Sequence, residues 1–134
     1  MTITYTINAP LEAVQAAELF ISAGLRRPVD DLERIGRMLE HADILITAWD
    51  GNRPVGVARA ITDYALCCYL SDLAVHKEYQ HQGIGKELVN VLRGHLGEEV
   101  MLLLLSAPTA MDYYPKIGFV KLVNAFEYPR RGFL

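Results

Sequence analysis

The sequence has few cysteines, no long apolar run and no excess of basic residues. Its two cysteines, Cys67 and Cys68, are adjacent, so they cannot link distant segments or supply the paired ligands of a zinc site. No stretch of about 18 apolar residues is present, which argues against a membrane-spanning helix. Residues 1–9 lack the basic start and apolar stretch of a signal peptide. These absences predict a cytoplasmic protein in a reducing compartment, without a metal and without a membrane partner.

The charge balance is slightly acidic, with 13 Lys and Arg against 16 Asp and Glu and a net charge of −3. Such a balance does not favour bulk electrostatic binding to nucleic acid, so an anionic ligand would have to be held by local features. The 134 residues are 51% apolar and 22% charged, which is enough for one packed core. We therefore expect a single domain over residues 1–134.

Hydrophobic patterning predicts a mixed α/β fold. Strands are expected at residues 3–7, 43–49, 54–62, 65–75, 100–105, 118–123 and 125–128. Helices are expected at residues 10–23, 31–41 and 84–96, with a short one starting at Pro108. Asp30 and Glu33 resemble a capping box, and Gly24 is a plausible helix stop. The bare apolar run at 100–105 is typical of a strand buried on both faces and parallel to its neighbour. The last two strands are expected to pair as a closing hairpin.

The segment from Val75 to Lys86 predicts a strand, a glycine-bearing loop and the start of a helix. The first amides of a helix have no internal partner, and together with the helix dipole they favour an anion. Gly83 and Gly85 lack a Cβ, so an oxygen-rich ligand can approach the backbone closely. This pattern favours a phosphate or pyrophosphate held by main-chain N–H groups. The alternative is that the two glycines only form a tight strand-to-helix turn.

Two common nucleotide motifs do not fit this loop. A Walker A loop needs Gly where Gln80 stands and Ser or Thr where Glu87 follows Lys86. A dinucleotide fingerprint needs a third glycine at the position of Leu88. Together with the acidic balance, these mismatches argue against a nucleotide- or nucleic acid-binding domain.

Two segments resemble motifs of the GCN5-related N-acetyltransferase (GNAT) superfamily. Residues 80–85 read Gln-His-Gln-Gly-Ile-Gly and match that family's Gln/Arg-x-x-Gly-x-Gly/Ala loop. Residues 110–119 resemble its Ala-x-x-aromatic-Tyr-x-x-x-Gly-Phe segment. The resemblance covers most of the chain and is strongest over residues 70–119. It implies a predominantly antiparallel twisted sheet with about four flanking helices, in which a splayed parallel strand pair opens a V-shaped cleft.

The resemblance also implies an activity. A member of this family would transfer an acetyl group from acetyl-CoA to a primary amine of a small molecule or peptide. The amine would attack directly through a tetrahedral intermediate, with acetyl-CoA as cosubstrate and without a metal or a covalent enzyme intermediate. The alternative is a non-catalytic acetyl-CoA- or CoA-binding module of the same fold. The sequence does not identify the acceptor amine.

The same resemblance assigns the cofactor contacts. The main-chain amides of the loop would hold the pyrophosphate, and the preceding strand would bind the pantetheine arm. The predicted cofactor-binding residues are Leu73, Ala74, Val75, Gln80, His81, Gln82, Gly83, Ile84, Gly85 and Lys86. The amide of Ala74 or Val75 would also meet the developing oxyanion. One position departs from the family, because Ala107 stands where many members carry an Asn that contacts the cofactor arm.

Tyr114 is the predicted proton donor. It occupies the tyrosine position of the second motif, and its hydroxyl would protonate the leaving thiolate. Pro115 follows directly and disfavours the helical conformation at the residue before it. We therefore expect the helix to break at Tyr114, which keeps Tyr113 as the alternative donor.

Asp72 is the predicted general base, since strand alternation places it on the same face as Ala74. The alternative bases are Asp63, Tyr64 and His76. The competing interpretation of Asp72 is that it caps a turn or pairs with an arginine.

Arg26 and Arg27 lie between the first two expected helices, the segment that builds the acceptor pocket in the family. Two arginines can clamp a carboxylate or phosphate, which implies an acceptor with an acid group as well as an amine. The alternative is a solvated loop with ordinary charges.

Family members are often dimers, and the apolar residues 125–128 with Phe133 and Leu134 suit a homodimer contact unless they pack on their own sheet.

Overall fold

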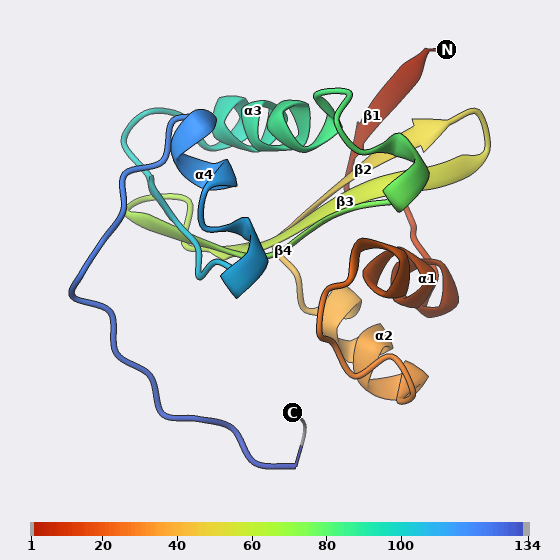
Figure 1. Cartoon of the computed structure of the whole chain (residues 1–134), viewed down its shortest axis with the longest axis horizontal. Helices are drawn as coiled ribbons and strands as arrows, with labels where there is room; N and C mark the ends of the chain where they lie inside the picture. The colour runs from red at the N-terminus through yellow and green to blue at the C-terminus, as the bar shows by residue number, and fades with distance from the viewer. Residues whose placement is uncertain (1, 133–134) are drawn as a thin grey trace. The chain divides into compact units, whose positions relative to one another are not determined.

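A computed structural model describes residues 2–132 of the chain (Figure 1). The strands are β1 (Ile3–Ile7), β2 (Ile44–Asp50), β3 (Arg53–Thr62), β4 (Cys67–Val75) and β5 (Met101–Leu103). The helices are α1 (Ala13–Ala23), α2 (Leu32–Glu40), α3 (Ile84–Leu96) and α4 (Tyr113–Lys116), with 3-10 turns η1 (Lys77–Tyr79) and η2 (Pro108–Ala110). The chain forms two compact units, Met1–Leu104 and Leu105–Leu134. The first unit holds the whole sheet and α1 to α3.

The five strands lie in the sheet in the order in which they occur along the chain. The first four are antiparallel neighbours, whereas β4 and β5 are parallel and pair through Cys67–Tyr69 and Met101–Leu103. This arrangement confirms the expected mixed sheet and the β-α-β unit through α3. Because β5 ends at Leu103 while β4 continues to Val75, the parallel pairing stops at Tyr69, and a V-shaped opening between the two strands stays a prediction.

Helices cover both faces of the sheet, with α1 and α2 on one side and α3 on the other (Figure 1). The core under α1 and α2 is made of Leu11, Ala16, Leu19, Phe20, Ile35, Leu45, Val57 and Ala74. On the opposite face Gly56 lies directly under α3. A Cβ at this position would come within 3.1 Å of Leu88 Cδ1 and 3.2 Å of Ile84 Cγ2. The apolar stripe of α3 therefore packs onto the sheet and fixes where the helix begins.

Local capping explains where α1 ends and α2 begins. Gly24 stops α1 as expected, with a left-handed φ of +73°. The cap of α2 is Asp31, whose side chain accepts a hydrogen bond from the backbone N–H of Arg34 at 3.0 Å. The expected capping box at Asp30 and Glu33 is therefore wrong by one residue. The helix begins at Leu32, so the residue directly before it is Asp31 and not Asp30, and Arg34 is its third helical residue.

The strand expected at 100–105 is shorter and less buried than its composition suggested. It pairs over three residues only, and Met101 is 54% exposed. The expectation of a strand buried on both faces is therefore wrong, although its parallel pairing is confirmed. Apolar composition alone does not reveal whether a strand lies at the edge of a sheet, and β5 is the edge strand here.

The expected closing hairpin does not form. Residues 118–123 and 125–128 adopt no strand, and Phe126 and Tyr128 are exposed. An isolated pair of strands gains too little burial to be stable without a further partner. Of the apolar residues expected at a homodimer contact, Phe133 and Leu134 lie outside the described residues, so the homodimer stays a prediction.

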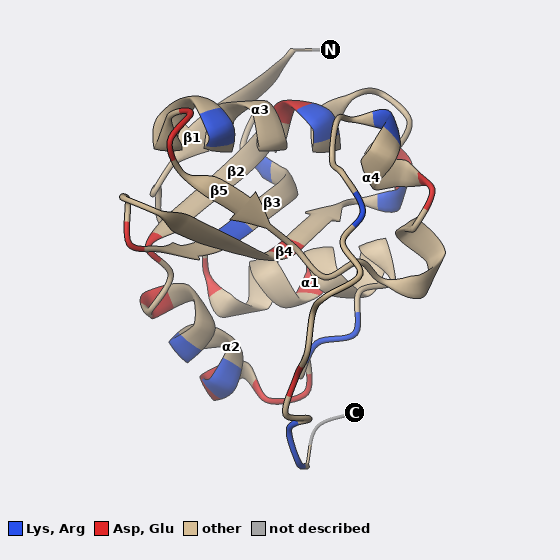
Figure 2. Ribbon diagram, turned by 90° about the vertical axis from the view of Figure 1, so that its left-hand side faces the viewer, with Lys and Arg blue, Asp and Glu red and all other residues tan. Residues whose placement is uncertain are grey.

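Charge is interspersed along the chain, with no long run of one sign (Figure 2). None of the helices in residues 2–132 has the length and apolar character needed to cross a bilayer.

Candidate functional site

The start of α3 has the geometry of an anion site. Gly83 is the residue that caps this helix, and it adopts a left-handed φ of +83°. A serine or aspartate at a cap accepts a hydrogen bond from the first helical amides, but glycine has no side chain to do so. The N–H groups of Ile84, Gly85 and Lys86 are therefore left for a ligand or solvent, whereas that of Glu87 donates to the carbonyl of Gly83 at 3.0 Å. The helix dipole adds partial positive charge at the same end.

The loop before α3 keeps this end open. A Cβ on Gly83 would meet no atom within 4 Å, so a ligand can reach the backbone there. His81 is also left-handed, with a φ of +64°, which costs a non-glycine residue of order 1 kcal/mol. Gln80 turns back toward the protein and donates from Nε2 to the carbonyl of Val75 at 2.9 Å. The loop is thus held by its own side chain while its amides stay open, which fits a pyrophosphate.

Strand β4 leads into this loop and carries a bulge. The register with β3 passes from Arg59 opposite Asp72 to Ala60 opposite Leu70, which leaves Ser71 as an extra residue. Bulges redirect the chain and occur often beside functional sites.

Burial alternates along β4, and Asp72 and Ala74 are both buried, which confirms that they share a face. Past Tyr69 the β5 side of β4 has no pairing with β5. The main-chain groups of residues 73–75 on that side can therefore bind an extended ligand as an added strand would.

Asp72 is the centre of a buried ion network. Its side chain is fully buried, and its two carboxylate oxygens accept from the Nε atoms of Arg27 and Arg59. Pairing with arginine is one of the two interpretations of Asp72 that the sequence left open. Each oxygen keeps a second lone pair, but the carboxylate is fully buried, so an amine or a water could reach it only after a neighbouring side chain moved. Its role as the general base stays a prediction.

Sequence reasoning missed Arg59 and Ser71. Arg59 lies in β3 with 8% of its side chain exposed and donates from Nη2 to Ser71 Oγ at 2.9 Å. A signal was present, since a charged residue inside the apolar run of residues 55–61 needs a buried partner. Nothing in the sequence indicated which partner that would be.

Arg27, one of the two predicted substrate-binding arginines, forms several hydrogen bonds within the protein. Arg27 donates from Nη1 to the carbonyl of Arg26 at 2.6 Å and from Nη2 to the carbonyl of Ser71 at 2.7 Å. With the bond to Asp72, these contacts use three of the five N–H groups of a guanidinium. Arg27 therefore ties the segment between α1 and α2 to β4. A role of Arg26 and Arg27 in binding an acceptor stays a prediction.

The tyrosine candidates lie in the second compact unit, in α4. Tyr114 is helical, so the break expected before Pro115 is wrong. A proline in the first turn of a helix removes an N–H that has no partner there anyway. The Tyr114 ring packs edge-on against Phe119 and Tyr113, with centroid distances of 5.5 and 5.3 Å. Burial raises the pKa of Tyr113 above its ordinary value. Which tyrosine donates a proton stays a prediction.

Each of the three alternative bases forms hydrogen bonds with the backbone. Asp63 accepts from three backbone N–H groups at 2.8 to 3.1 Å, and these bonds lower its pKa to about 2. The hydroxyl of Tyr64 donates to the carbonyl of Asp43 at 3.1 Å. Nδ1 of His76 accepts from the backbone N–H of Glu78 at 3.1 Å and caps η1. None of these contacts favours a proton acceptor for an amine.

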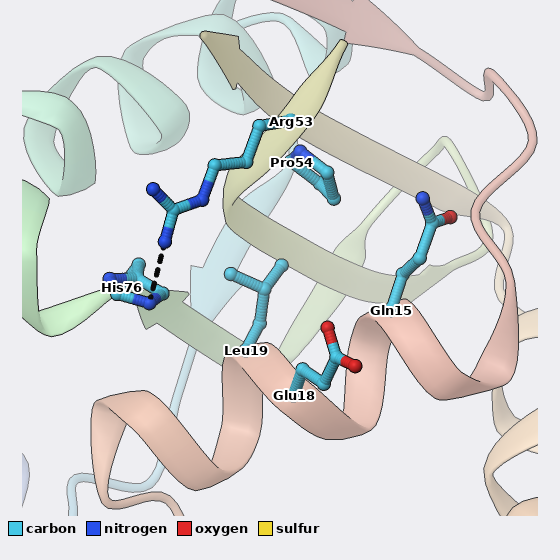
Figure 3. Close-up of a pocket in the computed structure, with 6 residues that line it drawn as sticks. All are labelled: Gln15, Glu18, Leu19, Arg53, Pro54 and His76. Carbon is cyan, nitrogen blue, oxygen red and sulfur yellow. Dashed lines mark hydrogen bonds between the residues drawn. The ribbon is translucent and has the colours of Figure 1, made fainter.

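A small pocket of about 160 Å³ lies between α1 and the neighbouring ends of β3 and β4 (Figure 3). Its lining residues are Gln15, Glu18, Leu19, Arg53, Pro54 and His76. Arg53 Nη2 lies 3.2 Å from His76 Nε2 (Figure 3). The pocket is smaller than the roughly 300–1,000 Å³ that usually encloses a drug-sized ligand. It is therefore a weaker candidate than the open start of α3.

Comparisons with known proteins identify relatives of the chain. A family model described as "Acetyltransferase (GNAT) domain" matches residues 17–132. The uncharacterised N-acetyltransferase ycf52 of Porphyra purpurea is 30% identical over 116 residues, which cover 79% of this chain and 65% of that protein. The chain thus spans less than two thirds of the length of that relative.

Solved structures share the fold. A probable acetyltransferase of unknown function from meticillin-resistant Staphylococcus aureus aligns with a TM-score of 0.83 at 24% identity, over 96% of this chain and 99% of that chain. The aminoglycoside N-acetyltransferase AAC(6′)-Iy, solved in complex with CoA, aligns with a TM-score of 0.69 at 14% identity, over 98% of this chain and 96% of that chain.

Proposed function

The chain belongs to the acetyltransferase (GNAT) family, and on that basis we propose that it transfers an acetyl group from acetyl-CoA to a primary amine of a small molecule or peptide. The observation that carries the proposal is the start of α3, where the side-chain-free cap Gly83 leaves the helix amides open to an anion. An aminoglycoside acetyltransferase of the same fold was solved with CoA, which supports both the donor and an amine acceptor. We propose that residues 1–134 act as one domain.

Acetyl-CoA would be held by two stretches of main chain. The amides of Gln80–Lys86 would bind its pyrophosphate, supported by the dipole of α3. The main chain of Leu73, Ala74 and Val75 would bind the pantetheine arm on the side of β4 that extends past β5. Both contacts use main-chain atoms, so Gln80 and Gly83 would contribute through the conformation that they give the loop.

Acetyl-CoA supplies an acyl group already activated as a thioester. The amide N–H of Ala74 or Val75 would donate to the acetyl carbonyl oxygen, and the hydroxyl of Tyr114 would give a proton to the departing sulfur. An alkylamine with a Lys-like pKa of about 10.4 must lose a proton before it reacts. A base acting directly or through water would take it, and Asp72 is the candidate if a neighbouring side chain moves to give access to its buried carboxylate. Transfer is direct, since no protein nucleophile is needed.

The acceptor side is set by the segment between α1 and α2. Arg26 and Arg27 would face an acid group on the acceptor, so the proposed substrate carries a carboxylate or phosphate beside its amine.

Cys67 and Cys68 are both free thiols, which supports the proposal of a reducing, cytoplasmic location. A homodimer remains part of the proposal, and no metal is included.

A thiol-release assay tests the proposal. Acetyl-CoA would be incubated with the protein and a panel of amines that carry a carboxylate or phosphate, such as amino acids, amine phosphates and lysine peptides, together with aminoglycosides and polyamines as amines without an acid group. An amine that accelerates thiol release supports the enzyme. If CoA binds in a thermal shift, with ATP and NAD as controls, and no amine accelerates release, the alternative of a non-catalytic CoA-binding module is right.

A further inference from the structure

The bulge of β4 is held by side chains rather than by the sheet. Ser71, the extra residue, has no partner on β3. Its carbonyl accepts from Arg27 Nη2 at 2.7 Å, and its hydroxyl accepts from Arg59 Nη2 at 2.9 Å. The next residue, Asp72, binds the Nε atoms of the same two arginines. Two guanidinium groups therefore fix two consecutive residues of β4.

The two arginines come from different parts of the fold. Arg59 belongs to β3 and is almost fully buried, whereas Arg27 belongs to the segment between α1 and α2 and has 24% of its side chain exposed. If Arg27 is removed, Asp72 keeps Arg59 as a single buried ion pair. The Ser71 carbonyl would then lose its side-chain donor. The backbone at the bulge would be less constrained, although charge balance in the core is kept.

We propose that Arg27 is a positioning residue for acetyl-CoA. By holding Ser71 and Asp72, it fixes the direction in which β4 leaves its bulge and so aligns the main chain of Leu73–Val75. This inference rests on the proposed function, in which that main chain binds the pantetheine arm. A residue expected from the sequence to bind the acceptor then controls the affinity for the other substrate.

Calorimetric titration with CoA, in the absence of any amine, measures this effect directly. The variants are Arg27→Met, which removes the donors, and Arg27→Lys, which keeps the charge but cannot form the same set of bonds. Both are expected to bind CoA about fivefold more weakly, the change that corresponds to one lost hydrogen bond of ordinary net strength.

Two control variants separate positioning from stability. Arg37→Met removes an exposed arginine of α2 whose partner Glu33 is also exposed. Ile35→Val removes one methyl group from the core on the α1 and α2 face, and so lowers stability without touching the bulge. Both controls are expected to bind CoA within about twofold of the wild type, the range of independent sites.

The outcomes are distinguishable. If either folded Arg27 variant binds CoA like the controls while its melting temperature falls, Arg27 is only structural and the inference is wrong. If the wild type itself does not bind CoA, the proposed function fails first and the inference falls with it. Weaker CoA binding by both Arg27 variants, with the controls unchanged, supports the positioning role.

Discussion

Replacing Gly83 by alanine separates the conformational role of this residue from its role at the proposed anion site. Gly83 has a φ of +83°, and a Cβ there would meet no atom within 4 Å. The cost of the added methyl group is therefore conformational and not steric. For an alanine in the left-handed region that cost is roughly 1–2 kcal/mol. In a domain of this size it corresponds to a fall in melting temperature of about 3–8 °C.

Gly24 provides a matched control within the same chain. It has a φ of +73°, and a Cβ at this position would also meet no atom within 4 Å, so Gly24→Ala carries the same backbone cost at the end of α1. Both variants are expected to lose the same stability in calorimetric unfolding. Only Gly83→Ala changes the backbone where the first amides of α3 begin. It is expected to weaken CoA binding by roughly 10- to 150-fold, since one bond to a charged phosphate is worth about 1.5–3 kcal/mol.

The measurement is a pair of titrations with CoA at equal ionic strength, accompanied by unfolding scans of both variants. If Gly83→Ala and Gly24→Ala lose stability equally and bind CoA with the same affinity, the amides at the start of α3 do not hold the ligand. The reasoning for the proposed function would then be wrong, even if transfer to an amine were observed.

Three further predictions concern the ion network, the acid limb of stability and the tyrosine. Asp72→Asn leaves the buried Arg59 and the partly exposed Arg27 without this counter-charge and is expected to lower the free energy of unfolding by roughly 3–5 kcal/mol in urea, whereas a loss below about 1 kcal/mol would contradict the buried pairing. Asp63 has its pKa lowered from 3.8 to about 2, so its stabilisation is present above pH 3.8 and disappears as the pH falls toward 2. The stability difference between wild type and Asp63→Asn should shrink over that interval and stay constant above it. Tyr114→Phe is expected to lower amine-dependent thiol release about 10²-fold or more without changing the CoA dissociation constant. If Tyr113→Phe has this effect and Tyr114→Phe does not, the proton donor is Tyr113.

Much of the fold could be predicted from the sequence because it depends on short-range patterns. The helix at 84–96 was predicted with the bounds that the structure shows, since its apolar stripe and its flanking glycines are local signals. The hairpin of β2 and β3 was predicted for the same reason. The strands predicted at 118–123 and 125–128 do not form, because an alternating apolar pattern becomes a strand only where a partner strand lies beside it.

The candidate site also has one part that follows from local sequence and another part that depends on tertiary packing. The open cap at Gly83 is a property of a few consecutive residues, so the sequence by itself determined that α3 begins with unpaired amides. The surroundings of Asp72 depend on Arg59 and Arg27, which are 13 and 45 residues away, and only the packing of β3 and the α1–α2 segment against β4 brings them together. A buried carboxylate must find opposite charge, but the sequence holds many arginines and does not say which one the tertiary structure will place beside it.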